Sequence, residues 1–496
     1  MTEMEKLKEK LLEISHLSAA AALLSWDQET FMPKGSAGFR AATLSTLSGL
    51  IHSRVTALEL VELIQRLTEA KAAGSLTEEE GHIVREIKRD VDRATKLPVE
   101  FVKEFSEATS LSIEVWQNAR AKSNFSLFEP SLQKIVDLNK RYAEYMGYED
   151  SPYNALLDGY EPNMTVAQLD EVFLDLKNFL VPFLAEVVAT KTFTPEQKIL
   201  GDFSEEGQKK FCEAIVERMG YDLATGRTDV STHPFTIGMH PRDVRITTRY
   251  DLANIFPAVF AAIHEAGHAI YEQGLLEKHY GTPLGESVSH GLHESQSRLW
   301  ENIVGRGRPF WEYFYPGLQE IFPKPFKELP LPDFLGAVNS VGPSLIRVEA
   351  DEVSYNLHII LRYEIEKGLM DGGLEVKDLP EIWRAKTKEY LGLEVEKDSD
   401  GVLQDVHWAH GSFGYFPTYT LGNIWSAQIY AAAKELNPGL EEDYKKGEFG
   451  RLKGWLNREI HAHGRAYSAS EIIKRATGQE ASATAYKDYL RTKYLA

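Results

Sequence analysis

Residues 264 to 268 read His-Glu-Ala-Gly-His, a spacing that brings two imidazoles and a carboxylate together. An α-helix turns once per 3.6 residues, so side chains four apart share a face and both imidazoles can bind one Zn²⁺. Zinc lowers the pKa of a bound water to about 7, and a neighbouring carboxylate can take its proton as the water attacks a peptide carbonyl. The pattern predicts a zinc peptidase, with His264 and His268 as ligands and Glu265 as general base.

The residues around this motif favour a buried helix. With 15 His in 496 residues, chance produces roughly 0.05 such motifs in the chain. Asn254 or Asp251 precedes the motif as a candidate N-cap. Apolar residues form one helical face, at Ile255, Val259, Ala262, Ile263 and Ile270. The alternative, a pair of buried histidines satisfied by hydrogen bonds, explains the pattern less well.

A catalytic zinc site needs a third protein ligand and one open position. Glu272 lies four residues beyond His268, which places it roughly 9 Å along the helix axis from a metal held between the two histidines. The remaining candidates are Glu286, Glu294 and Glu301. Glu294 lies in residues 293 to 301, which read as a second helix after a connection containing Gly and Pro. Spacing alone does not choose among the three.

Five further strings accompany the motif in order along the chain. They are residues 233 to 235 (HPF), 243 to 247 (D-x-R-x-T), 293 to 296 (HES-Q), 346 to 351 (I-R-x-x-A-D) and 401 to 408 (G-x-x-Q-D-x-H-W). Together with residues 26 to 33, they resemble the carboxypeptidase Taq family of zinc metallocarboxypeptidases over nearly the whole chain. No motif position departs from the family pattern.

The resemblance implies one Zn²⁺ per chain, held by His264, His268 and Glu294, with Glu265 as general base and acid. It implies a neurolysin-like, almost wholly helical fold around a deep active-site cleft, and the release of C-terminal amino acids one at a time. A homodimer follows from the same resemblance. Co²⁺ is an alternative metal, because His and carboxylate ligands also accept it.

A carboxypeptidase must bind the free C-terminal carboxylate of its substrate, and a guanidinium suits this because it donates two parallel hydrogen bonds. We favour Arg347, since it lies in the string 346 to 351 on a segment expected to be helical. Arg245 ranks second, and Arg249 and Arg298 are further candidates.

The tetrahedral intermediate needs a hydrogen-bond donor for its oxyanion. The segment 401 to 425 is rich in aromatic and polar side chains and suits the wall of a site. It supplies the candidate donors Tyr419, Tyr415 and His407. His233 is a further candidate for substrate binding, and Asp351 and Asp405 are candidates to orient a ligand imidazole.

Helical periodicity dominates the chain. Helices are expected over residues 2–25, 37–52, 56–72, 77–95, 97–122, 127–147, 166–190, 204–219, 345–368, 378–391 and 423–436. Residues 243 to 250 alternate as a strand and are a candidate edge for an extended peptide. We expect a mainly α, single-unit fold over residues 1–496, with a small β element near the metal site. Two lobes around the cleft would comprise a helical scaffold, about 1–230, and a catalytic part, about 231–496.

Composition excludes several classes of protein. The chain is 43% hydrophobic and 26% charged, and it lacks an apolar run of about 18 residues, which argues against a membrane protein. A net charge of −19 argues against nucleic-acid binding, which needs clustered Lys and Arg. The single cysteine, Cys212, and an N-terminus without a secretion signal favour the cytoplasm. Peptides with a free C-terminus are the partners that the family resemblance implies.

Two alternatives differ from this prediction. An oligopeptidase would cut internal bonds with the same metal site but without a carboxylate clamp. A non-catalytic helical protein would hold zinc in a closed structural site, usually with four protein ligands and frequently with Cys. A chain with one cysteine fits that second alternative poorly.

Overall fold

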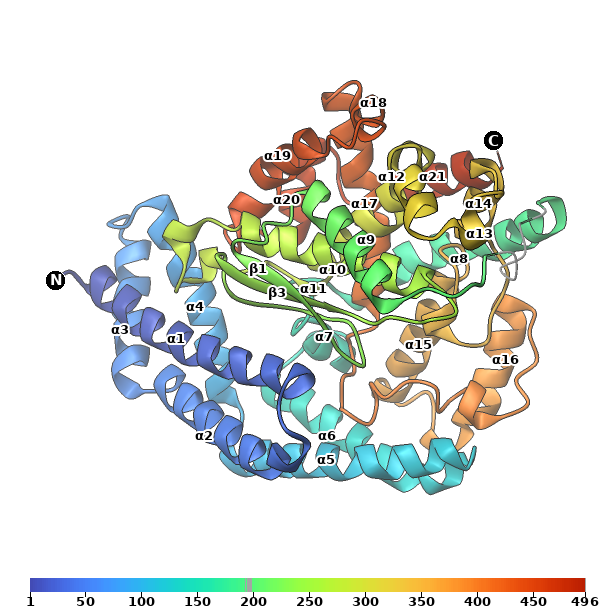
Figure 1. Cartoon of the computed structure of the whole chain (residues 1–496). Helices are drawn as coiled ribbons and strands as arrows, with labels where there is room; N and C mark the ends of the chain where they lie inside the picture. The colour runs from blue at the N-terminus through green and yellow to red at the C-terminus, as the bar shows by residue number, and fades with distance from the viewer. Residues whose placement is uncertain (192, 194–198, 496) are drawn as a thin grey trace.

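The computed structural model describes residues 1–191, 193 and 199–495. Its α-helices are α1 (Glu3–Thr30), α2 (Ala37–Val55), α3 (Leu58–Ala72), α4 (Glu78–Lys96), α5 (Val99–Ala121), α6 (Glu129–Met146), α7 (Pro152–Leu157), α8 (Val166–Thr190), α9 (Glu205–Met219), α10 (Phe256–Gly274), α11 (His290–Arg298), α12 (Arg308–Ile321), α13 (Pro323–Phe326), α14 (Leu331–Val338), α15 (Tyr355–Met370), α16 (Leu379–Leu391), α17 (Pro417–Leu436), α18 (Leu440–Tyr444), α19 (Gly450–Glu459), α20 (Ala469–Thr477) and α21 (Thr484–Tyr494). Its strands are β1 (Gly226–Val230), β2 (Thr236–His240) and β3 (Asp243–Thr248). The mainly α prediction with a small β element is confirmed (Figure 1).

The expected helices are present with small shifts of their ends, apart from the segment 345 to 368. The helix there, α15, begins only at Tyr355, and a short 3-10 turn, Arg347–Glu349, precedes it. Asp351 Oδ1 accepts hydrogen bonds from the backbone N–H groups of Val353 and Ser354, and such local bonds compete with helix formation. The expectation that Arg347 lies on a long helix is therefore wrong.

The three strands form one sheet in the order β1-β3-β2. β1 pairs with β3 in parallel, whereas β2 pairs with β3 antiparallel. Helix α10 packs against β2 and β3, while α1 packs against β2. Trp26 of α1 also contacts the other two strands, because its ring lies 4.9 Å from the guanidinium carbon of Arg227 on β1 and 4.4 Å from that of Arg245 on β3. The sheet thus lies between the N-terminal helices and the helix that carries residues 264 to 268 (Figure 1).

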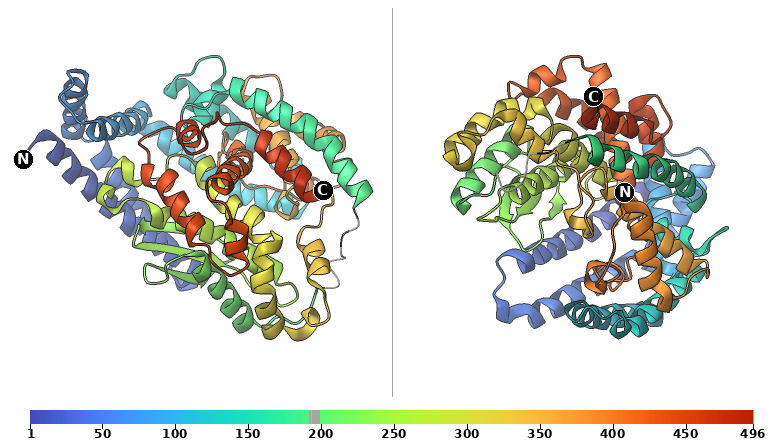
Figure 2. Two further views of the ribbon diagram at one scale, coloured as in Figure 1. Left: turned by 90° about the horizontal axis from the view of Figure 1, so that it is seen from above. Right: turned by 90° about the vertical axis from the view of Figure 1, so that its right-hand side faces the viewer.

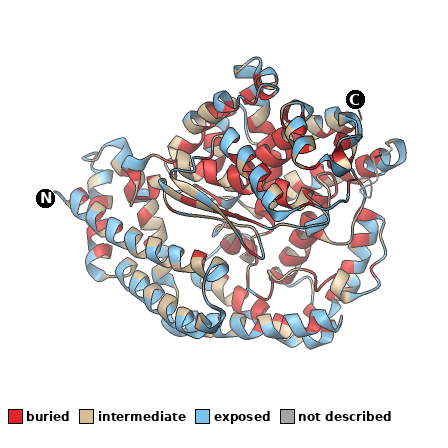
Figure 3. Cartoon of the chain, in the orientation of Figure 1, coloured by how far each residue is buried: buried red, intermediate tan, exposed pale blue. Residues whose placement is uncertain are grey.

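The most buried helices lie in the middle of the molecule. Buried residues concentrate in α10, α11, α15 and α17 (Figure 3). A smaller apolar cluster joins α1, α3 and α4, whereas α2, all of which the structure describes, contains no buried residue. The two termini lie at opposite sides of the molecule (Figures 1 and 2). The division into two lobes near residue 230 stays a prediction.

Within the described residues, every helix is too short or too polar to cross a membrane.

Candidate metal and catalytic site

Helices α10 and α11 bring three metal-binding side chains together. The Nε2 atoms of His264 and His268 on α10 lie 3.6 and 3.4 Å from Glu294 Oε2 on α11. The three ligand atoms all lie within 4.8 Å of one another. Tetrahedral zinc with bonds of about 2.05 Å separates its ligand atoms by roughly 3.4 Å. The spacing and the donor types therefore fit a divalent metal ion.

Two glycines permit the close approach of the helices around this group. A Cβ atom on Gly267 of α10 would lie 2.7 Å from the backbone Cα of Ser297 on α11. A Cβ atom on Gly422 of α17 would lie 2.5 Å from the Cγ atom of Glu294. Because no larger side chain fits at either position without a shift, α11 is held between α10 and α17 at a fixed distance.

His264 is oriented by a carboxylate on the far side of its ring. Its Nδ1 atom lies 2.9 Å from Glu301 Oε2, and Glu301 Oε1 accepts a hydrogen bond of 3.1 Å from Arg306 Nη2. Glu301 lies in a π-helical segment, Leu299–Gly305, directly after α11. Such an outer carboxylate sets the ring orientation and tautomer of a metal-binding imidazole. From the sequence Glu301 is a candidate third ligand only, and no local pattern indicates its contact with His264.

His268 is held differently. Its ring stacks on the ring of His293, with centroids 4.4 Å apart. His293 Nε2 in turn lies 2.8 Å from Glu272 Oε1. Among the described residues, the Nδ1 atom of His268 has no hydrogen-bond partner. Burial first, and then His293, lower the pKa of His268 to about 3, which keeps this imidazole neutral and able to bind a metal.

Glu294 is kept ionised by its neighbours. Arg298 Nε donates a 2.7 Å hydrogen bond to Oε1, which leaves Oε2 directed toward the two imidazoles. Burial alone would raise the pKa of this carboxyl, but Arg298 and His264 outweigh burial and hold it well below its usual range. The other two candidate carboxylates are engaged elsewhere, since Glu286 pairs with Arg465 and Glu301 with His264.

Glu265 is positioned by the sheet. Thr236 Oγ1, on β2, donates hydrogen bonds of 2.7 Å to Glu265 Oε2 and 2.9 Å to its backbone oxygen. Burial raises the pKa of Glu265, which brings it closer to the range useful for a general base. Thr236 directly follows the string 233 to 235. This position next to a motif is the one feature of the sequence that could have indicated the contact with Glu265.

Arg347 lies beside the same site but is partly engaged. Its Nε and Nη2 atoms donate to Asp405 Oδ1, at 3.0 and 2.6 Å, and Nη1 donates to the Tyr355 hydroxyl at 3.0 Å. The ring of Tyr355 also contacts Arg298, which is bonded to Glu294. Arg347 is thus linked to the ligand helix through one aromatic ring. The strings 346 to 351 and 401 to 408 contact each other through the hydrogen bonds between Arg347 and Asp405.

The segment 401 to 425 forms an aromatic cluster beside Arg347. The ring of Tyr419 lies 5.3 Å from the Arg347 guanidinium carbon and 5.3 Å from the ring of Tyr415. His407 Nε2 lies 3.4 Å from the Tyr419 hydroxyl. Burial lowers the pKa of His407 to about 4 and raises that of Tyr415 to about 12. At neutral pH the imidazole is therefore uncharged, whereas the tyrosines retain their O–H donors.

Two further predicted residues, Arg245 and His233, have other described contacts. Arg245 forms a double hydrogen bond with Asp243 on its own strand, in addition to its contact with α1. His233 is exposed, and its backbone oxygen accepts a hydrogen bond from Ser231.

The expectation that Asp351 and Asp405 orient a ligand imidazole is wrong. Asp405 pairs with Arg347 and Arg362, and Asp351 bonds the backbone ahead of α15.

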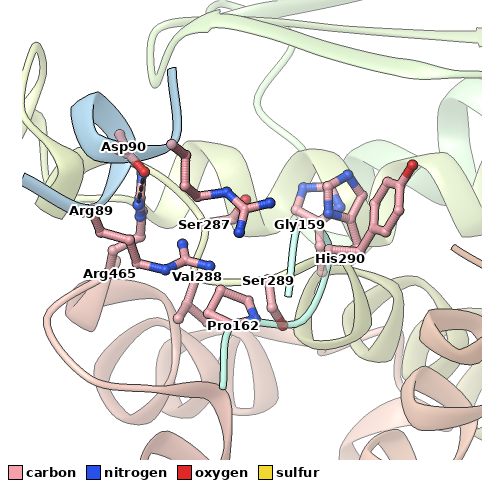
Figure 4. Close-up of a pocket in the computed structure, with 12 residues that line it drawn as sticks. Arg89, Asp90, Gly159, Pro162, Ser287, Val288, Ser289, His290 and Arg465 are labelled. Atoms are coloured by element: carbon pink, nitrogen blue, oxygen red, sulfur yellow. Dashed lines mark hydrogen bonds and ion pairs between the residues drawn. The ribbon is translucent and has the colours of Figure 1, made fainter. Parts of the chain in front are cut away.

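A cavity of about 420 Å³ adjoins the metal-binding group at His293. Its walls come from α4, the turn after α7, the start of α11 and the segment after α19. Figure 4 shows Arg89 and Arg465 on one side of this cavity and His290 on the other. His293 links this cavity to the metal-binding group, because its ring stacks on that of His268.

A protein-family model described as carboxypeptidase Taq (M32) metallopeptidase matches residues 6–494. This chain belongs to that family. Carboxypeptidase 1 of Bacillus subtilis (strain 168) is 42% identical over 484 residues, which cover 98% of this chain and 96% of the relative. Thermostable carboxypeptidase 1 of Thermus thermophilus is 41% identical over 503 residues, which cover 99% and 98%. The crystal structure of M32 carboxypeptidase from Deinococcus radiodurans R1 is similar with a TM-score of 0.96, at 41% identity, over 100% of this chain and 99% of that chain.

These relationships confirm the predicted family, the helical fold and the activity. The protein is a metallocarboxypeptidase, a peptide hydrolase that depends on a divalent metal. They support that prediction over the oligopeptidase and over a non-catalytic zinc protein.

Replacing Gly422 with alanine tests the packing around Glu294. The added methyl group would overlap Glu294 Cγ and displace its carboxylate, so we expect metal affinity to fall about tenfold or more, as for other losses of ligand support. Competition with a chromophoric zinc chelator measures the change. Gly317→Ala in α12 is the control, because its new Cβ meets no atom within 4 Å. Equal affinities of the two variants would contradict the packing argument.

Glu301→Gln tests the orientation of His264. The amide keeps the size of the side chain but removes the charge that faces His264 Nδ1 and Arg306. We expect metal affinity to fall about 10- to 100-fold, measured by the same chelator competition. Unchanged affinity would show that His264 needs no such partner.

Proposed function

We propose that this chain binds one Zn²⁺ through His264, His268 and Glu294 and releases C-terminal amino acids from peptides with Glu265 as general base. The convergence of the three ligand atoms beside the buried Glu265 carries this proposal. Zinc fits better than magnesium, because imidazole ligands suit zinc and oxygen ligands suit magnesium. Co²⁺ is a workable substitute for the same reason.

The reaction needs proton transfer in two directions. A zinc ion supplies a Lewis acid that polarises the peptide carbonyl and lowers the pKa of water. Glu265 takes a proton from the attacking water and then delivers it to the leaving amine as the C–N bond breaks. Thr236 holds Oε2 of Glu265 in place during both transfers. No covalent acyl-enzyme is formed in this scheme.

Tyrosine hydroxyls are the proposed donors to the developing oxyanion. Tyr419 is the first candidate and Tyr415 the second, because burial raises the pKa of both and keeps their hydroxyl protons in place. His407, which lies 3.4 Å from the Tyr419 hydroxyl, positions that tyrosine as a neutral imidazole. His233, in the loop that leads to β2, is the weaker candidate for substrate binding.

Arg347 is the proposed clamp for the substrate's terminal carboxylate. Asp405 and Tyr355 hold its guanidinium in one orientation, and each terminal nitrogen of a guanidinium has a second N–H to donate. Arg245 is the weaker candidate, since it is occupied by Asp243 and by the ring of Trp26.

We further propose that the enzyme acts on peptides in the cytoplasm as a homodimer. The only cysteine, Cys212, is buried and unpaired, which suits a reducing compartment. The dimer follows from the family resemblance, and the net charge of −19 argues against nucleic acids as partners.

Glu265→Gln separates proton transfer from metal binding. The amide cannot accept the proton from water, so we expect kcat to fall about 10²- to 10⁴-fold. Zinc content, measured by elemental analysis, should stay at one ion per chain. Near-normal turnover in this variant would refute the role of Glu265.

Mass spectrometry of a free-ended peptide and its C-terminally amidated twin tests the reaction itself. We expect the wild-type enzyme to produce a ladder of C-terminal losses from the free peptide alone, and chelation should abolish the ladder. In Arg347→Lys the two-pronged geometry is lost, so KM for the free peptide should rise about tenfold or more. Internal cuts in both peptides would instead identify an endopeptidase.

A further inference from the structure

The short helix α7 and the turn after it lie between two walls of the site. One wall is α11, here called the ligand helix, and the other is the segment 401 to 425, here called the aromatic loop. The ring of Tyr160, in this turn, has its centroid 5.5 Å from the ring of His290 on α11 and 5.1 Å from that of Tyr415. Tyr160 also accepts a backbone hydrogen bond from His290. Figure 4 shows Gly159 and Pro162 of the turn beside Ser289 and His290. One continuous segment therefore contacts both the ligand helix and the aromatic loop.

Glu366 joins α7 to the aromatic loop. Its Oε2 atom accepts hydrogen bonds from the Tyr153 hydroxyl on α7, at 2.7 Å, and from Gly414 N, at 3.0 Å. Its Oε1 atom accepts a 2.8 Å bond from Trp408 Nε1. Trp408 directly follows His407, and Gly414 directly precedes Tyr415. The two loop residues that one carboxylate holds thus adjoin the proposed substrate-binding side chains.

The backbone of this loop depends on the same anchoring. Gly414 has φ = +90°, a conformation that favours glycine, and a Cβ atom there would lie 2.9 Å from the backbone of Leu156 in α7. The loop is therefore pressed directly onto α7 at the point where Glu366 binds it.

Glu161 joins the same segment to the ligand helix. Its Oε1 atom accepts a short hydrogen bond from Gly291 N, in the first turn of α11. A Cβ atom on Gly291 would lie 2.7 Å from that oxygen and 2.8 Å from the ring of Trp425. Gly291 lies three residues before Glu294, so this bond fixes the end of the helix that presents the ligand.

Both carboxyl groups are buried at an energetic cost. Glu161 is 1% exposed and Glu366 is 0% exposed, and among the described residues neither forms an ion pair with a cation. Burial raises the pKa of Glu161 to about 8 and that of Glu366 to about 7. A buried carboxyl is tolerated where hydrogen bonds satisfy it, so the N–H and O–H groups named above are its main support.

We propose that residues 152 to 161 form a strut that sets the distance between the two walls of the active site, with Glu366 and Glu161 as its positioning residues. Glu366 holds the loop that carries His407 and Tyr415, and Glu161 holds the helix that carries Glu294. The two residues act on different parts of one reaction, substrate contact and metal binding. This inference rests on the proposed roles of Glu294 and of the aromatic loop.

The test compares Glu366→Ala with Glu161→Ala. In Glu366→Ala we expect kcat/KM for a free-ended peptide to fall about tenfold or more, with zinc affinity within about twofold of the wild type. In Glu161→Ala we expect zinc affinity to fall about tenfold or more, with activity recovered at saturating zinc. Glu161→Gln should restore the affinity, because its amide oxygen can still accept the Gly291 hydrogen bond.

Tyr153→Phe covers the case in which Glu366→Ala does not fold. It removes one hydrogen bond to Glu366 and leaves the bonds from Trp408 and Gly414 in place. Tyr315→Phe is its matched control, since that hydroxyl donates a 2.7 Å bond to Leu329 O and lies on α12, which carries none of the proposed site residues. We expect similar losses of thermal stability in the two variants but a fall in kcat/KM only in Tyr153→Phe.

Two outcomes would overturn the strut. In the first, both glutamate variants lower zinc affinity and kcat/KM together in proportion to their loss of thermal stability. In the second, neither measurement changes. Failure of the proposed function is recognised separately, because the wild-type enzyme would then release no C-terminal residues in a zinc-dependent manner.

Discussion

The contact of α11 with α10 and α17 determines the rest of the active site. α11 is only nine residues long, yet it carries Glu294, and Gly291 N in its first turn donates a hydrogen bond to Glu161. Backbone atoms approach closely on both of its sides, at Gly267 and Gly422. At packing of this density a side chain has no room to compensate for a shift of the helix. The position of Glu294 Oε2 relative to the two imidazoles is therefore a property of three helices rather than of one.

Ionised groups are placed around this contact in linked pairs. Glu294 accepts a hydrogen bond from Arg298. Glu301 accepts one from Arg306 and is also hydrogen-bonded to the ring of His264. Farther from the metal-binding group, Asp405 lies between Arg347 and Arg362. Buried charges are tolerated only when they are paired and hydrogen-bonded, so each pair also restricts where its side chains can point. These pairs thus hold the proposed substrate clamp, Arg347, and two of the proposed metal ligands, His264 and Glu294, in one orientation.

The three-stranded sheet supports the site in a different way from the helices. It contributes no metal ligand among the described residues, but β2 supplies Thr236 to Glu265, and Thr247 of β3 bonds the loop ahead of β2. The strings 233 to 235 and 243 to 247 are therefore parts of one support beneath Glu265, the proposed general base. In the same way the strings 346 to 351 and 401 to 408 meet in the bond between Arg347 and Asp405. Motifs that are far apart in the sequence act here as pairs.

The sequence by itself determined the local features of this protein. The spacing of His264, Glu265 and His268 and the period of the apolar residues depend only on the geometry of one helix, so both were predictable. Spacing left three carboxylates open and the family resemblance implied Glu294, which the tertiary structure places beside the imidazoles. Only the tertiary structure decided that Glu301 lies behind His264 and that Thr236 meets Glu265. The segment around Arg347, which the sequence predicts to be helical, forms a short 3-10 turn in the structure. These contacts join segments separated by tens of residues in the chain, and their geometry follows from helix packing and glycine contacts that no local period encodes.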